Sequence, residues 1–166
     1  MTAQHIINSL EFARKSHAIH DTIAASQLMR IKDWLASNAG SLNWSLVGEV
    51  SASGEPRLHF ELNGILQVAC QRCLEPIQLN LDLKSEFILV KDESEIPVED
   101  EEVDDKDYLV ADEAFDVMQL IEDEVLLAMP YAPMHDIKDC PAGDAVTELK
   151  APNPFATLKD FKVVKN

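Results

Sequence analysis

Two cysteines stand two residues apart in the segment Cys70-Gln-Arg-Cys73 of a chain that contains 3 cysteines in 166 residues. The third, Cys140, comes shortly after His135. Thiolate sulfur and imidazole nitrogen are the ligands that structural zinc sites use, four to an ion. Cys70, Cys73, His135 and Cys140 therefore form one candidate zinc set of three sulfurs and one nitrogen.

Three interpretations of these cysteines are open. A strong zinc signature has two close pairs of ligands, whereas this chain has one close pair and one looser pair. The second interpretation is that the cysteines are small soft side chains without a ligand. The third is a redox pair, but such pairs lie at a helix N-terminus, and here Pro76 and a strand pattern follow Cys73. A pKa of the Cys70 thiol near that of free cysteine would remove the redox interpretation.

The rest of the sequence favours a protein that is not an enzyme. It contains neither a glycine-rich phosphate loop nor a Gly-x-Ser-x-Gly turn. A zinc ion held by all four candidate ligands would have no open position for a substrate, which makes such a site structural. The other histidines have no nucleophile or carboxylate at motif spacing: His5, His17, His20 and His59.

The charge of the chain points to a basic partner. The sequence has 30 acidic and 14 basic residues, for a formal net charge of −16. Such a charge repels phosphate backbones and attracts basic proteins. Ten of the residues from Asp92 to Asp107 are acidic, which predicts a flexible acidic loop at about 91–107. This loop is either a solvated insertion or a docking site, with Asp100, Glu101 and Glu102 as its candidate partner-binding residues.

Hydrophobic periodicity predicts a helix before the strands. Apolar residues recur at helical spacing between about Ile23 and Asn38, and Gly40 follows as a stop. The period then changes to two over 43–50, 57–62, 65–69 and 77–83, and 87–90 continues the last strand or begins another. An Asn63-Gly64 pair between two alternating runs predicts a hairpin turn, because both turn residues must take a positive φ. The cysteine pair lies at the bend between two strands.

A second helix is predicted to begin after Asp116, which can cap its first turn, and to end at Pro130. Val117, Leu120, Ile121, Val125 and Ala128 would share its apolar face. Three acidic residues lie early in this helix, where the helix dipole favours negative charge. They form a second candidate surface for a basic partner: Glu122, Asp123 and Glu124.

Together these patterns predict an α+β fold. We expect an antiparallel sheet or small open barrel of five or more strands, with one helix before it and one after it. Residues 1–166 would form a single domain with a loosely ordered C-terminal tail at about 141–166. The N-terminus shows no secretory signal, and the longest uncharged apolar stretch, 125–133, is too short to span a bilayer. We therefore expect a cytoplasmic protein without a membrane partner.

Four segments together resemble the bacterial large ribosomal RNA subunit accumulation protein family, YceD. They occur in the family's order and spacing and cover roughly residues 65–160. The segments are CQRCLEP at 70–76, LIEDEVLLAMP at 120–130, Pro133-Met134-His135 with Cys140, and NPFATL at 153–158.

The resemblance implies a cytosolic, non-enzymatic factor needed for synthesis, processing or stability of large-subunit ribosomal RNA. Its pattern carries onto the four candidate zinc ligands and the acidic helix. Some family members have a second Cys-x-x-Cys downstream, whereas Pro141 and Ala142 follow Cys140 here, which makes His135 the decisive fourth ligand. The expected partner is a basic ribosomal protein or the large-subunit precursor, and direct RNA contact by the basic tail stays open. The alternative is a zinc-stabilised acidic adaptor that binds an unrelated basic protein.

Overall fold

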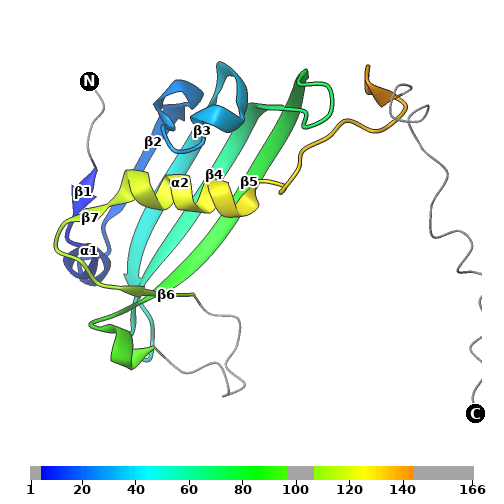
Figure 1. The fold of residues 1–166 in the computed structure, drawn as a ribbon. Helices are drawn as coiled ribbons and strands as arrows, with labels where there is room; N and C mark the ends of the chain where they lie inside the picture. Colours follow the sequence, from blue (N-terminus) through cyan, green and yellow to red (C-terminus); the bar gives the residue numbers. More distant parts are fainter. Residues whose placement is uncertain (1–4, 97–106, 144–166) are drawn as a thin grey trace, which may run out of the picture.

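The computed structural model describes residues 5–96 and 107–143, which build an open five-stranded sheet (Figure 1). The strands lie in the order β2-β3-β4-β5-β6, and each strand pairs antiparallel with the next up to β5. The last strand, β6, joins β5 in parallel. The predicted α+β fold is thus confirmed as an open sheet, which is mixed and does not close into a barrel. The strands are β2 (Ala18–Ala24), β3 (Leu35–Val50), β4 (Pro56–Ala69), β5 (Pro76–Val90) and β6 (Asp107–Val110).

Two helices and a second small sheet complete the described part of the chain. Helix α2 (Val117–Ala128) crosses the strands on one face of the sheet (Figure 1). The short helix α1 (Ser9–Arg14) lies near one end of the strands. Strand β1 (Ile6–Ile7) pairs antiparallel with β7 (Phe115–Asp116), which joins the N-terminal segment to the start of α2. Three short 3-10 turns are η1 (Ala25–Gln27), η2 (Lys32–Trp34) and η3 (Glu93–Glu95).

The hydrophobic core lies on the face of the sheet that α2 covers. Every second residue of β4 from Leu58 to Val68 is buried there except Gly64, as a strand with one packed face requires. These residues are Leu58, Phe60, Leu62, Leu66 and Val68. The apolar face of α2 meets them through Val117, Ile121 and Val125, each 0% exposed. The helix thus has the buried face that the sequence predicts.

The opposite face of the sheet is polar. Arg57 on β4 pairs with Glu86 on β5 at 2.5 Å, and Lys84 pairs with Glu61 at 3.0 Å. Exposed pairs of this kind contribute at most about 1 kcal/mol each to stability. The alternation of polar and apolar side chains therefore fixes which face of the sheet is packed.

The predicted helix at about 23–38 is wrong. That segment supplies the end of β2, the turns η1 and η2, and the start of β3. Leu28 and Ile31 are buried as predicted, at 1% and 0% exposure. Both residues lie between η1 and η2, outside either turn, and their side chains enter the core from this loop. A loop that packs its apolar side chains inward can therefore show the spacing of an amphipathic helix.

The helix before the sheet is instead α1. Its N-cap Asn8 accepts a hydrogen bond from the backbone N–H of Glu11 at 2.9 Å. The helix has 6 residues, which is less than two turns and too short for hydrophobic periodicity to reveal.

The predicted hairpin turn at Asn63 and Gly64 is also wrong, because β4 runs through both residues. Gly64 has φ +154°, and a Cβ there would lie 2.4 Å from the carbonyl oxygen of Ser41. Gly40, the predicted helix stop, lies in β3 with φ +114°, and its Cβ would lie 2.4 Å from the carbonyl oxygen of Ile65. Both glycines therefore serve the close approach of β3 and β4 beside a bulge.

The predicted turn at 51–55, the predicted strand after the cysteines and the predicted second helix are confirmed. Residues 51–55 form the turn between β3 and β4, and the predicted strand after the cysteines continues through 87–90 as β5. Asp116 caps α2 by accepting hydrogen bonds from the backbone N–H groups of Met118 at 2.9 Å and Gln119 at 3.4 Å. The helix ends shortly before Pro130.

Part of the predicted acidic loop and most of the predicted tail lie outside the described residues. Residues 97–106, with Asp100, Glu101 and Glu102, and residues 144–166 belong to these parts. At the described edges of the acidic loop, Asp92 caps η3 by accepting from the N–H of Ser94 at 2.9 Å, and Asp107 begins β6. Across 5–96 and 107–143, no helix is long and apolar enough to cross a membrane.

Helix α1 packs directly on β3 at Gly48, and this contact gives a test of the fold. A Cβ at Gly48 would lie 2.6 Å from the Cα atom of Ala13 and 2.6 Å from the carbonyl oxygen of Phe12. We expect Gly48→Ala to lower the free energy of unfolding by about 1–3 kcal/mol, because the helix must move away from the strand. Urea unfolding measures the change.

The matched control is Ser41→Ala on the same strand, where the side chain is exposed. It should change stability by less than about 0.5 kcal/mol. Equal stabilities of the Gly48→Ala variant and the wild type would contradict the packing of α1 on β3.

Candidate metal centre

The four predicted metal ligands come together at the turn between β4 and β5. One sulfur or ring nitrogen atom from each of Cys70, Cys73, His135 and Cys140 lies within 4.8 Å of every other. Cys70 and Cys140 are buried, while Cys73 and His135 are half-buried. The structure thus joins the close cysteine pair with the looser pair, although the two are far apart in the sequence.

The turn that carries the first two cysteines is closed by backbone hydrogen bonds. The N–H of Cys70 donates to the carbonyl oxygen of Glu75 at 3.0 Å, and the N–H of Leu74 donates to that of Cys70 at 2.9 Å. Leu74 has φ +64°, the left-handed conformation that residues other than glycine seldom adopt. This conformation turns the chain from one strand into the next and keeps the two cysteines on the same turn.

A second segment, residues 133–143, lies against this turn. The N–H of Gln71 donates to the carbonyl oxygen of Pro133 at 2.8 Å. The guanidinium group of Arg72 lies 3.6 Å from the sulfur of Met134. These contacts bring His135 and Cys140 to the cysteine pair, and the N–H of Gly143 closes the turn after Cys140 by donating to its carbonyl oxygen at 2.8 Å.

The orientation of His135 suits a metal ligand. Its Nε2 lies 3.2 Å from the carbonyl oxygen of Pro76. A carbonyl oxygen only accepts hydrogen bonds, so Nε2 must carry the proton in this contact. The other nitrogen, Nδ1, then has a free lone pair in the neutral ring and faces the Cys73 sulfur at 3.4 Å. Histidine ligands of metals are held in this way, by a hydrogen bond from the nitrogen that does not bind the ion.

The environment of Cys70 favours a thiolate. Burial opposes ionisation of this thiol, but hydrogen bonds from the backbone N–H groups of Cys73, His135 and Arg72 outweigh it and lower the pKa of Cys70 to about 5. The Arg72 N–H lies 3.4 Å from the sulfur. Backbone amides therefore do here what a helix N-terminus does in redox cysteine pairs.

Cys73 shows the opposite behaviour. Burial raises the pKa of its thiol, the backbone N–H of Glu75 opposes this rise, and the neighbouring thiols of Cys70 and Cys140 add to it. Several sulfurs so close together cannot all carry a negative charge unless a cation balances them. A divalent cation among them would deprotonate these thiols, because metal-bound thiols lose their protons.

The pKa of Cys70 lies well below that of free cysteine, so the redox interpretation stays open on this ground. The geometry nevertheless favours a metal. A redox pair needs two thiols, whereas a third thiol and an oriented imidazole converge here. In a tetrahedral zinc site the ligand atoms lie about 3.5–3.8 Å apart, as follows from Zn–S and Zn–N bonds of about 2.3 and 2.0 Å. The distance of 3.4 Å between Cys73 Sγ and His135 Nδ1 lies just below this range, and all four ligand atoms lie within 4.8 Å of one another.

The acidic residues of α2 have partners within the fold. Glu122 is 8% exposed, and its carboxylate accepts a hydrogen bond from the backbone N–H of Arg30 at 2.9 Å. Asp123 forms an ion pair with the guanidinium group of Arg30, and Glu124 accepts a hydrogen bond from the hydroxyl of Ser85. The sequence predicts a surface position for all three. The structure instead buries Glu122, which fastens the loop between η1 and η2 to α2. A partner-binding role for this group stays a prediction.

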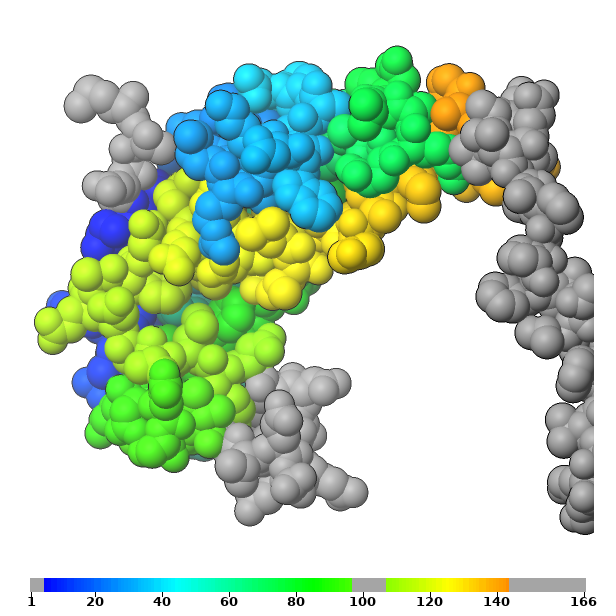
Figure 2. Space-filling model, in the orientation of Figure 1, coloured from blue at the N-terminus to red at the C-terminus, as the bar shows by residue number. Residues whose placement is uncertain are grey.

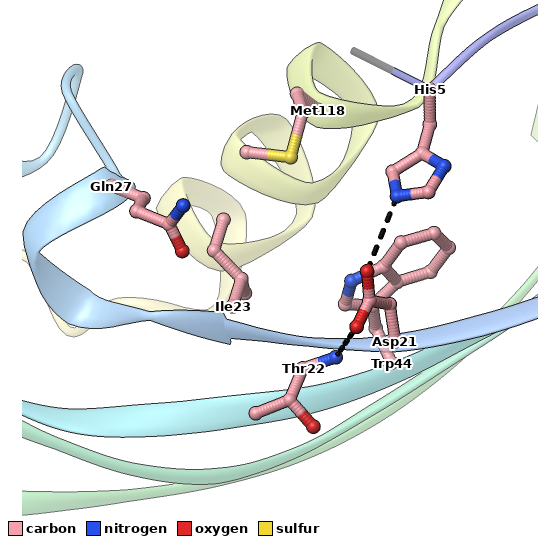
Figure 3. Close-up of a pocket in the computed structure, with 7 residues that line it drawn as sticks. All are labelled: His5, Asp21, Thr22, Ile23, Gln27, Trp44 and Met118. Carbon is pink, nitrogen blue, oxygen red and sulfur yellow. Dashed lines mark hydrogen bonds and ion pairs between the residues drawn. The ribbon is translucent and has the colours of Figure 1, made fainter. Parts of the chain in front are cut away.

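One pair of polar residues that the spacing did not suggest is His5 and Asp21. The Nε2 of His5 lies 3.4 Å from Oδ2 of Asp21, and its ring stands edge-on to Trp44 at 5.2 Å between centroids (Figure 3). The nearby hydroxyl of Thr22 donates to the side chain of Asn43 on β3 at 2.9 Å. It points away from His5 (Figure 3). The cavity beside them has a volume of about 40 Å³. This pair therefore fastens the N-terminal segment to β2, and among the described residues that line the cavity no nucleophile faces it.

The buried carboxylate of Glu122 gives a test of the acidic helix. We expect Glu122→Ala to lower the free energy of unfolding by about 1.5–3 kcal/mol, because the N–H of Arg30 loses a charged acceptor. Glu122→Gln keeps an oxygen acceptor and should lose about half as much. Urea unfolding of both variants measures the difference. If Glu122→Ala is as stable as wild type, the contact with Arg30 does not hold the loop.

Comparisons with known proteins give the family of this chain. The sequence profile of the large ribosomal RNA subunit accumulation protein YceD family matches residues 58–162, which include all four candidate ligands. The chain is 27% identical over 154 residues to the large ribosomal RNA subunit accumulation protein YceD of Haemophilus influenzae, and the match covers 84% of each protein. No solved structure gives a significant match. Since the profile covers more than half of the chain, the protein belongs to the YceD family, whose name implies a role in accumulation of the large ribosomal RNA subunit.

Proposed function

We propose that this protein is a non-enzymatic, cytoplasmic assembly factor of the large ribosomal subunit that acts by binding a basic ribosomal protein. The observation that carries the proposal is the family match over residues 58–162. The relative from Haemophilus influenzae has the same family name and matches over most of its length. The factor would be needed for synthesis, processing or stability of large-subunit ribosomal RNA.

The charge of the chain supports a protein partner. A net charge of −16 disfavours contact with RNA and favours a fast encounter with a basic protein. Two acidic groups would meet this partner. The first is formed by Asp100, Glu101 and Glu102 of the acidic loop. The second is on α2, where the side chain of Asp123 is 44% exposed and Glu124 is half-buried, while the buried Glu122 supports them from within the fold.

We assign one structural zinc ion to Cys70, Cys73, His135 and Cys140, because three sulfurs and one imidazole nitrogen are a ligand set that zinc uses and these atoms lie within 4.8 Å of one another. When bound, the ion would supply a cross-link between the β4–β5 turn and residues 133–143. The protein's own groups orient the site, since Pro76 holds the tautomer of His135 and backbone amides favour the thiolate of Cys70. With all four positions filled by side chains, no position is left for a substrate.

A second candidate function is a zinc-stabilised acidic adaptor for a basic protein unrelated to the ribosome. The group of four candidate zinc ligands and the negative charge of the chain are the observations that favour this adaptor. Both would serve a basic partner outside the ribosome equally well. The two functions differ in their effect on ribosomal RNA.

The zinc assignment predicts one zinc ion per chain in the full-length protein purified without chelators. His135→Ala should weaken zinc binding by about tenfold or more, because a tetrahedral site would lose one of its ligands. Removal of zinc should also lower the melting temperature, since an ion that binds only the folded chain stabilises it. Elemental analysis and thermal unfolding measure both effects.

His20→Ala is the matched control, because His20 is exposed on β2. It should keep the zinc content and the melting temperature of wild type. A wild-type protein that neither contains zinc nor takes it up under reducing conditions would refute the assignment.

The assembly function predicts that cells without this protein contain less large-subunit ribosomal RNA and normal small-subunit ribosomal RNA. Sucrose gradients with quantification of both RNAs in each fraction test this. A chain in which most acids of 92–107 are replaced by Ser or Asn should restore the RNA less well than wild type and capture basic ribosomal proteins more weakly at low salt. Equal amounts of both RNAs in cells that lack the protein, under stress and in rich growth, would favour the unrelated adaptor.

A further inference from the structure

A groove lies between α2, the end of β5 and β6. It has a volume of about 550 Å³ and opens to solvent. Its apolar lining includes Phe87, Leu109 and Leu120, and Leu127 stands at its edge with 81% exposure. Figure 2 shows the hollow beside α2, with the green strand β5 behind it. The volume falls within the range of binding sites in proteins, about 300–1,000 Å³.

The apolar surface continues past the groove along the end of α2. Leu126 lines both the groove and a second hollow of about 190 Å³ on the other side of the helix. That hollow is lined by Trp34 and Met129, and by Tyr131, which is 95% exposed. Single exposed apolar residues are ordinary, but a continuous apolar strip with hollows on either side marks an interaction surface. Its elongated shape suits a peptide segment better than a compact small molecule.

Acidic side chains surround this apolar lining. Asp107, Asp123 and Glu124 all line the groove, and among the described residues that line it Arg30 is the one basic residue. Arg30 is already paired with Asp123. The local charge is therefore negative, as is the charge of the whole chain, and it complements a segment that carries Lys or Arg next to apolar side chains.

We infer that this groove is the docking site for a segment of the basic partner in which Lys or Arg residues flank aliphatic or aromatic side chains. The apolar side chains enter the groove beside Leu127, and the basic groups lie over Asp107 and Glu124. This inference rests on the proposed function, since it locates the surface that holds the basic protein. It adds an apolar contact, which resists salt, to the charge attraction, which salt screens.

Fluorescence anisotropy with the full-length protein and two labelled peptides tests the inference. One peptide has leucines on a single helical face among lysines, and the other has serine in place of each leucine. We expect wild type to bind the leucine peptide at physiological salt and the serine peptide only at low salt. Leu127→Lys should weaken binding of the leucine peptide by about tenfold or more, because the apolar contact is replaced by charge repulsion. Asp107→Asn should weaken it less, and mainly at low salt.

The matched control is Ile65→Ser, because Ile65 is 43% exposed on the polar face of the sheet. It should bind the leucine peptide as wild type does. If Leu127→Lys also binds as wild type does, the groove is not the docking site. Dimers of wild type that dissociate in Leu127→Lys would assign the groove to a second copy and overturn the inference. If the leucine peptide binds only after Phe155→Ser and Phe161→Ser are introduced, the chain's own C-terminal segment competes for the groove, and the inference is overturned.

The experiments distinguish an error in the docking site from an error in the proposed function. Cells that carry Leu127→Lys in place of wild type show whether the groove serves ribosomal RNA. Loss of peptide binding with normal large-subunit RNA would confirm the groove and contradict its ribosomal role. Unchanged peptide binding by Leu127→Lys would show that the groove is not the docking site. The RNA profile of cells without the protein would still test the proposed assembly function.

Discussion

One helix must cover the apolar face of a sheet that is much longer than the helix, and the rest of the structure follows from this constraint. Helix α2 has 12 residues and is about 18 Å long. Strand β3 has 16 residues and extends about 50 Å, whereas five strands span only about 19 Å across the sheet. The helix therefore lies across the strands and matches the width of the sheet (Figure 1). The helix therefore leaves part of the length of the strands uncovered.

Other segments cover what α2 leaves open. Helix α1 packs Ala13 onto Gly48 at one end, where the absence of a side chain lets the helix backbone touch the strand. On the other side of α2, Leu28 and Ile31 enter the core from the loop between η1 and η2. The carboxylate of Glu122 holds this loop by its backbone. The groove beside β6 lies where these segments leave the sheet uncovered, although Arg30 of the loop reaches its lining. The apolar part of the lining continues the same face of the sheet.

The parts of the fold that sequence patterns predicted are those that a local rule determines. Alternation identified β3, β4 and β5 but not β2 or β6, and the capping residue Asp116 with Pro130 bounded α2. The errors arose where a local pattern has two structural explanations. The spacing of Leu28 and Ile31 suits a helix, but both residues enter the core from the loop between η1 and η2. An Asn-Gly pair suits a hairpin, but Gly64 lies inside a strand because the neighbouring backbone comes too close for a side chain. Such a contact between distant segments leaves no local signal.

The candidate metal site was predictable from residue types, but its organisation was not. Three cysteines and one histidine are few enough that their types suggested one cluster, and the structure brings all four together. The groups that orient them are backbone atoms: the carbonyl oxygen of Pro76 and the amides around Cys70. Any residue type supplies these atoms, so sequence cannot reveal them. For the same reason, a redox role could not be judged from the lack of a helix after Cys73.

The acidic residues show that net charge alone does not identify a binding surface. Glu122 is buried and holds a loop, Asp123 is paired with Arg30, and Glu61 and Glu86 pair across strands on the polar face. These carboxylates contribute to the charge of −16 but already have partners. Attraction at long range depends on the sum of all charges, whereas the place of docking depends on where charge lies next to apolar surface that nothing in the described residues covers. In this fold that place is the groove that α2 leaves open, so the constraint that shapes the core also locates the surface on which a basic partner can dock.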